Sequence, residues 1–66
     1  MNLNPKKNAS KWTQDRLNRH PGPFTEEKRG ILANPQPPHV GECVLVQEIS
    51  SGWLGWFPLS EVDIVS

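Results

Sequence analysis

The stretch "GWLGWFPLSEVDIVS", residues 52–66, contains three of the five aromatic residues of this 66-residue chain. A short aromatic run, a proline turn and a valine-rich run follow one another, which is typical of two short strands joined by a turn. Glycine and serine precede the first run and supply a tight turn back to residues 42–49. The stretch therefore predicts strands over residues 53–57 and 61–65.

Residues 42–49, "ECVLVQEI", are the clearest strand, because β-branched residues are concentrated there. Alternation places Cys43, Leu45 and Ile49 on one face, which we expect to point inward, and Val44 and Val46 on the other. Two partly apolar faces predict a central strand. The run "KRGILA", residues 28–33, predicts a further strand upstream.

Residues 34–41 contain three prolines and predict an extended loop between two strands. The segment "PQPP", residues 35–38, has a second interpretation, as a polyproline ligand for the groove of another protein. The stiff loop is the simpler interpretation, because the segment lies between two predicted strands.

The first half of the chain has a different composition. Residues 1–30 hold six apolar residues and residues 31–66 hold seventeen. We therefore expect residues 1–23 to be a flexible basic arm, and residues 24–66 to fold without it as one small β domain. The pattern also admits a short helix capped by Ser10 and ending at Arg19, after which Pro21 forms a hinge.

Charge is distributed unevenly along the chain. Residues 1–30 carry seven Lys or Arg and three Asp or Glu, a net charge of +4. Residues 31–66 carry four acidic residues and no Lys or Arg, a net charge of −4. This asymmetry has two interpretations: the basic segment binds an anionic partner, or it folds back on the acidic half of its own chain.

The end of the chain resembles the distal half of SH3 domains, whose matching stretch reads roughly G-W-F-P-S-N-Y-V. The coinciding residues are Gly55, Trp56, Phe57, Pro58 and Val62. The resemblance covers about fifteen residues and implies an all-β fold, a small antiparallel SH3-like barrel or meander. Proline-peptide binding in that family uses tyrosines that this chain lacks. Of the family's groove residues, the resemblance carries over only Trp53 and Pro58.

The chain has more large aromatic side chains than the core of a small barrel can bury. Along residues 53–57, alternation places Trp53 and Phe57 on one face and Leu54 and Trp56 on the other. Both faces cannot point into one core. We therefore expect one of the two tryptophans to be partly exposed and to bind a partner. The alternative is that it packs under the proline-rich loop.

No catalytic, metal or cofactor signature is present in the sequence. His39 and Cys43 lie close together, but no second cysteine or nearby histidine completes a zinc set. A chain this short has little room for a substrate cleft, so we expect no enzyme activity. The single cysteine and the lack of a signal-peptide pattern predict an intracellular, cytoplasmic protein, and no apolar run is long enough to cross a membrane.

These patterns predict a non-enzymatic regulatory protein that docks on a larger protein or ribonucleoprotein machine. Because the chain begins with methionine, we expect a complete gene product. Stand-alone proteins of this size include phage-encoded and other modulators of RNA polymerase or another host enzyme, so transcription regulation is one expectation by association. The expected protein-binding residues are Trp53, Trp56, Pro58, Trp12, Arg16 and Arg19.

Two alternatives remain open at the level of the sequence. The first is an SH3-like protein that binds nucleic acid, because the basic segment combines cations with an aromatic residue. The residues that would neutralise phosphates are Lys6, Lys7, Lys11, Arg16 and Arg19. The second is a small accessory subunit of a large complex.

Overall fold

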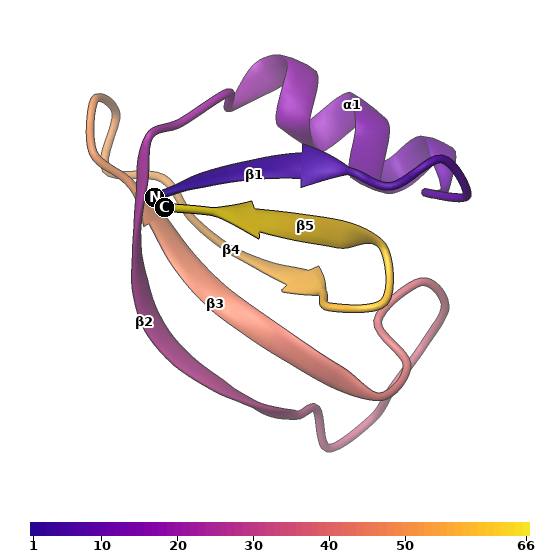
Figure 1. Ribbon diagram of the computed structural model, residues 1–66. Coiled ribbons are helices and arrows are strands. Elements are labelled where there is room, and N and C mark those ends of the chain that lie inside the picture. Colours follow the sequence, from indigo (N-terminus) through magenta and orange to yellow (C-terminus); the bar gives the residue numbers. More distant parts are fainter.

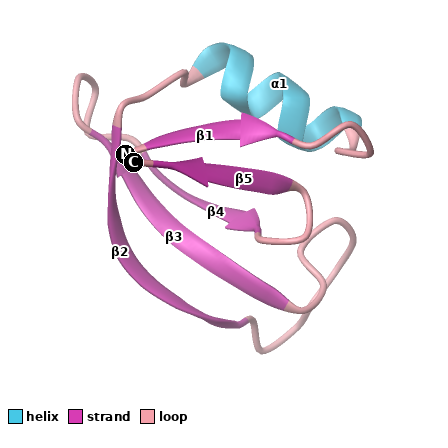
Figure 2. Ribbon diagram, viewed as in Figure 1, coloured by secondary structure: helices cyan, strands magenta, loops and turns pink.

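A computed structural model describes residues 1–66 and contains five strands and one helix. Along the chain these are β1 (Asn2–Pro5), α1 (Lys11–Arg19), β2 (Phe24–Ile31), β3 (Glu42–Glu48), β4 (Leu54–Pro58) and β5 (Val62–Val65) (Figure 1). The protein is mostly β structure, as the sequence predicted, with antiparallel pairing throughout (Figure 2).

The strands form two sheets. One has the order β2-β3-β4, and the other consists of β1 paired with β5. The start of β2 lies beside the start of β1, where Phe24 N donates to Met1 O at 2.7 Å. The sheets curve around a shared core without closing into a barrel (Figure 1). This arrangement is consistent with the predicted SH3-like fold.

The last strand pairs differently from a simple meander. Its partner is β1 at the other end of the chain, with Leu3 opposite Ile64, and the two termini therefore lie side by side (Figure 1). The predicted meander is limited to β2, β3 and β4. Pairing across the whole chain length leaves no local pattern, which is why the sequence did not predict it.

The structure does not show the expected flexible arm. Residues 1–23 contain β1 and α1, and Leu3 and Leu17 are 4% and 7% exposed. Both belong to the same buried cluster as Phe24 and Phe57. The boundary expected after residue 23 therefore does not separate a core from an arm. Two leucines at the right positions outweigh the low apolar content of the segment.

The short helix admitted by the sequence is present. Thr13 N donates to Ser10 Oγ at 3.4 Å, which caps the first turn, and His20 N donates to Arg16 O at the last turn. Nine residues are too few for a stable isolated helix. Burial of Thr13 and Leu17, one turn apart on the same face, supplies the missing stability.

β3 is the central strand of its sheet, as predicted, but its inward face differs from the expected one. Val44 and Val46 are fully buried in the core, whereas Leu45 is half-buried and Ile49 is 61% exposed. Cys43 is buried as expected, although it lies opposite Pro58 on the outer face, where burial raises the pKa of its thiol. Alternation gave the two faces correctly but not which of them meets the core.

β2 begins earlier than the predicted strand over residues 28–33. It starts at Phe24, whose ring is 1% exposed, and it contains a bulge between Glu26 and Lys28. The turn between β3 and β4 ends at Gly52, whose φ of +77° favours glycine, and Gly52 N donates to Glu48 O. The predicted tight turn is therefore present.

Candidate functional site

Aromatic rings line the junction between α1 and β4 in an unbroken series. Trp12 lies edge-on to His39, with 4.3 Å between the ring centroids, and contacts Phe57 at 5.9 Å. Phe57 contacts Trp53 at 5.9 Å, and Trp53 stacks flat on His20 at 4.1 Å. We call this series the aromatic seam: His39, Trp12, Phe57, Trp53 and His20. It attaches α1 and the proline-rich loop to the strands.

Trp53 is enclosed within the aromatic seam. Its indole lies against the backbone of Gly55, where an added Cβ would overlap the ring, and its other contacts are His20 and Phe57. The indole is half-buried, but its main contacts are inside the protein. Trp53 therefore holds the fold together at this position.

Trp56 lies on the other face of the β2-β3-β4 sheet. It is paired with Leu45, which is paired with Lys28, so the three side chains form one row across the strands. The Lys28 ammonium lies 5.8 Å from the Trp56 ring centroid. With Leu54, 53% exposed, this row forms what we call the Trp56 face: Lys28, Leu45, Leu54 and Trp56. α1 lies on the opposite side of the sheet (Figure 1).

Pro58 occupies a different environment from the other predicted contact residues. It is among the fully buried side chains, next to Cys43 on the neighbouring strand. The Trp56 face therefore ends before Pro58. The two predicted tryptophans are separated as well, because Trp53 belongs to the seam and Trp56 to the outer face. Trp12, from the first half of the chain, joins Trp53 in the seam.

Glu61 links the last turn of the chain to the start of α1. Its Oε1 accepts hydrogen bonds from Ser10 N, Ser10 Oγ and Thr13 Oγ1 at 2.8, 2.7 and 2.7 Å. A carboxylate at a helix N-terminus also interacts favourably with the helix dipole. Burial alone raises the pKa of Glu61, but these hydrogen bonds together hold it below its ordinary value.

Glu48 makes the corresponding link at the other end of α1. The residue is 3% exposed, and its carboxylate accepts hydrogen bonds from Ser51 Oγ, from Gly22 N at 3.0 Å and from His20 Nδ1 at 3.1 Å. The bonds from Ser51 and Gly22 lower the pKa of Glu48 most, against the opposing effect of burial. His20 contributes in the same direction.

The two glutamates realise one interpretation of the charge asymmetry, in which the basic segment folds back on the acidic half. The donors are mainly hydroxyls and backbone amides, with His20, rather than lysines and arginines. A single Lys or Arg ion pair joins the two halves, Lys6 with Asp63 at 3.8 Å. The other cations of residues 1–23 remain without a carboxylate partner: Lys7, Lys11, Arg16 and Arg19.

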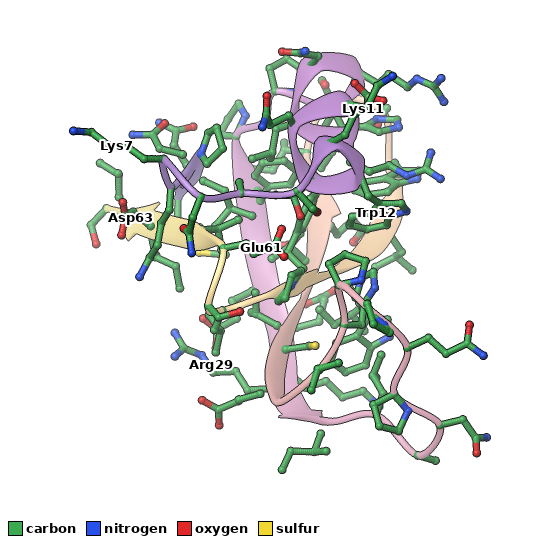
Figure 3. The ribbon with its side chains drawn as sticks, turned by 90° about the vertical axis from the view of Figure 1, so that its right-hand side faces the viewer. Lys7, Lys11, Trp12, Arg29, Glu61 and Asp63 are labelled. Carbon is green, nitrogen blue, oxygen red and sulfur yellow. The ribbon has the colours of Figure 1, made fainter.

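These cations do not form one patch. Lys7 projects on the same side as Asp63, while Lys11 lies with α1 on the side of Trp12 (Figure 3). Arg16 places its guanidinium carbon 5.3 Å from the Trp12 ring centroid. The five predicted phosphate-binding residues therefore divide into Lys6 and Lys7 after β1, and the three cations on α1.

Sequence reasoning missed the roles of His20, His39, Glu48 and Glu61. It found no completed metal set around His39 and gave His20 no role, whereas both histidines lie against tryptophans, and His39 Nε2 is also 2.9 Å from Trp56 O. Neither glutamate has a local motif that marks it, because their partners in the first half of the chain lie 26 to 51 residues away. Only the capping pattern at Ser10 was visible beforehand.

We expect the unfolding midpoint in urea to fall as the pH drops below about 4.5, the region where an unfolded glutamate takes up its proton. Glu48 and Glu61 have lowered pKa values when folded, so their stabilisation is complete above that region and is lost as the pH falls through the folded pKa values. Glu61→Gln should lower the urea midpoint at pH 7. The midpoint of this variant should then fall less steeply than that of the wild type as the pH drops. Glu27→Gln, at an exposed position, is the matched control and should preserve the wild-type profile. If the midpoint of Glu61→Gln falls at acidic pH as steeply as that of the wild type, the stabilising role assigned to the Glu61 carboxylate is contradicted.

The structure has no pocket, and no group of three or more His, Cys, Asp or Glu side chains lies close enough to hold a metal ion. The single helix, α1, is neither long enough nor apolar enough to cross a membrane.

No protein-family model, curated protein or solved structure matches this chain. The exposed side chains described above give two candidate contact surfaces, the Trp56 face and the exposed side of α1.

Proposed function

We propose that the protein is a non-enzymatic docking protein that binds a larger protein through the Trp56 face. The observation that supports this most is a half-exposed tryptophan beside Leu45 and an exposed Leu54, on a sheet face that α1 does not cover. Aromatic side chains near the centre of an interface contribute most of its binding energy. Backbone pairing of β2, β3 and β4 aligns Lys28, Leu45 and Trp56 in one row across this face.

The arrangement of Lys28 supports a protein partner for this face. Its ammonium lies near the Trp56 ring, so its alkyl chain crosses Leu45 in the same row. Lysine stems extend apolar surface while keeping the charge in water. The face therefore combines a central apolar row with a charged margin, the composition of a protein interface.

We expect Trp56→Ala to weaken partner binding by about 30-fold, which corresponds to ~2 kcal/mol. Tagged wild-type protein first captures partners from the native host, and the affinity of each purified partner is then measured by calorimetry for both proteins. Ile31→Ala is the control, because Ile31 is 75% exposed and its register places it on the other face of the sheet. Amide NMR spectra confirm that both variants are folded.

A partner that binds Trp56→Ala as tightly as the wild type would contradict this use of the face. An equal loss of partner affinity in Ile31→Ala would show that the effect of Trp56→Ala is not specific to the Trp56 face. Because the measurement uses a purified partner, capture of an unidentified protein does not count as support.

Nucleic-acid binding is the second candidate function. It is favoured by one observation: the cations on α1 lack carboxylate partners, and one of them, Arg16, lies over the Trp12 ring. Such binding weakens steeply with salt, because each neutralised phosphate releases counterions. Titration with DNA and RNA at low and moderate salt separates it from protein docking, for which salt matters less.

A further inference from the structure

The exposed side of α1 carries a contiguous group of cations. At 100° per residue, Lys11, Asp15, Arg19, Trp12 and Arg16 follow one another around the helix within an arc of 140°. Thr13 and Leu17 lie outside this arc and face the core. We call the three cations together with Trp12 the cationic arc: Lys11, Trp12, Arg16 and Arg19.

No carboxylate of the protein forms an ion pair with these three cations. The carboxylates nearest to the two ends of α1 belong to Glu61 and Glu48, and their hydrogen bonds come from hydroxyls, amides and His20. The remaining ion pairs of the molecule involve Lys6 and Arg29. Lys11, Arg16 and Arg19 therefore remain available to an external anion.

Arg16 is held in a defined position within the arc. Its guanidinium lies over the Trp12 ring, and Trp12 is in turn fixed between His39 and Phe57. A guanidinium stacked on an aromatic ring keeps its N–H donors free for a carboxylate or a phosphate. Because the side chain is already ordered, binding an anion costs less conformational entropy.

We propose that the cationic arc binds an acidic polypeptide segment of the docking partner. The inference rests on the proposed docking function and names the chemistry of the partner. The arc and the Trp56 face lie on different sides of the sheet, and His39 connects them by contacting Trp12 and lying 2.9 Å from Trp56 O. A partner that occupies both surfaces therefore reaches around the β4 edge of the sheet, past His39.

Three features favour an acidic polypeptide over nucleic acid. Asp15 lies between Lys11 and Arg19 on the arc and would repel a continuous row of phosphates. Lys11 and Arg19 are eight residues apart, so the arc is only about 12 Å long. The molecule as a whole has zero net charge, so it offers a long polyanion no general attraction beyond the arc. Widely spaced carboxylates on a peptide fit this pattern better.

The test uses full-length ¹⁵N-labelled protein at low salt with three probes. These are a twelve-residue peptide that alternates Glu and Gly, the same peptide with Gln in place of Glu, and single-stranded dT12. We expect the Glu peptide to bind at least tenfold more tightly than the Gln peptide and to shift the Trp12 indole N–H and Arg16 side-chain signals. Arg16→Gln should weaken the Glu peptide at least fivefold.

Arg29→Gln is the matched control, because it removes one positive charge from β2, where Arg29 pairs with Glu26 at 2.9 Å. We expect it to leave peptide affinity unchanged. Should Arg16→Gln fail to fold, Arg19→Gln tests the same arc from an exposed position, with an expected two- to threefold loss. Amide spectra establish which variants are folded.

Several results would overturn the inference. If Arg16→Gln and Arg29→Gln lose equal affinity for the Glu peptide, binding responds only to the net charge of the protein. If the wild type binds the Glu and Gln peptides equally, the peptide charge has no role in binding. Tighter binding of dT12 with a log–log salt slope approaching three phosphates would assign the arc to nucleic acid. If the Glu peptide fails while a purified partner still depends on Trp56, the inference fails alone. If peptide binding persists but no partner depends on Trp56, the proposed function fails instead.

Discussion

Deletion of residues 1–23 is expected to abolish cooperative folding of the remaining chain. It removes β1, which is the only strand paired with β5, and it removes Leu3 and Leu17 from the core. Truncating one buried leucine typically costs ~2–5 kcal/mol. The whole stability of a native domain is usually ~5–15 kcal/mol, so losing both leucines and a strand exceeds what this chain can tolerate.

The measurement is the dispersion of amide NMR signals in residues 24–66, followed by urea unfolding. The matched control keeps the full length and changes only the charge, with Lys7→Gln and Lys11→Gln combined, since both side chains are exposed and unpaired. We expect this control to unfold at nearly the wild-type midpoint. A dispersed spectrum for residues 24–66 would mean that the second half has its own sufficient core, as its composition alone had suggested.

The second large effect is expected for Gly55→Ala, a change of one methyl group. The new Cβ would overlap the six-membered ring of Trp53, which cannot retreat because it is stacked on His20 and in contact with Phe57. Overpacking of this kind typically costs ~1–3 kcal/mol and sometimes more. The expected loss lies at the upper end of that range, since moving Trp53 also disturbs the contact between α1 and β4.

Urea unfolding followed by tryptophan fluorescence measures this loss. Gly30→Ala is the matched control, because a Cβ at Gly30 in β2 meets nothing within 4 Å. We expect the control to be neutral or slightly stabilising, since alanine restricts the unfolded chain. Similar midpoints for the two variants would show that Trp53 can move away from Gly55 at little cost, and that the seam is not a rigid element.

Local patterns predicted several elements correctly. The β-branched run at residues 42–49 predicted β3 and its central position, and the serine-glycine turn before Trp53 predicted the connection to β4. Ser10 predicted the start of α1. Each of these signals depends on residues close together in the chain, whose preferences act without help from distant parts.

The candidate site was predicted only in outline. The crowding of aromatics indicated that one tryptophan must lie outside the core, and Trp56 does lie on the outer face of its sheet. The sequence did not show that Gly55 and His20 enclose Trp53, or that Trp12 joins it. The contacts of Trp53 with His20 and of Trp12 with Phe57 connect residues 33 and 45 positions apart, for which no periodicity exists.

The sequence by itself determined the antiparallel β character, the strand-turn-strand order of β3 and β4, and the start of the short helix. Tertiary structure decided which face of β3 is buried, because alternation defines two faces but only the packing of Leu3, Leu17 and Phe24 selects one. It also decided that residues 1–23 belong to the fold. Their apolar content is low, yet Leu3 and Leu17 fill the core. Glu61 and Glu48 satisfy the polar groups at the two ends of α1, and this long-range complementarity is not visible in any local stretch of the chain.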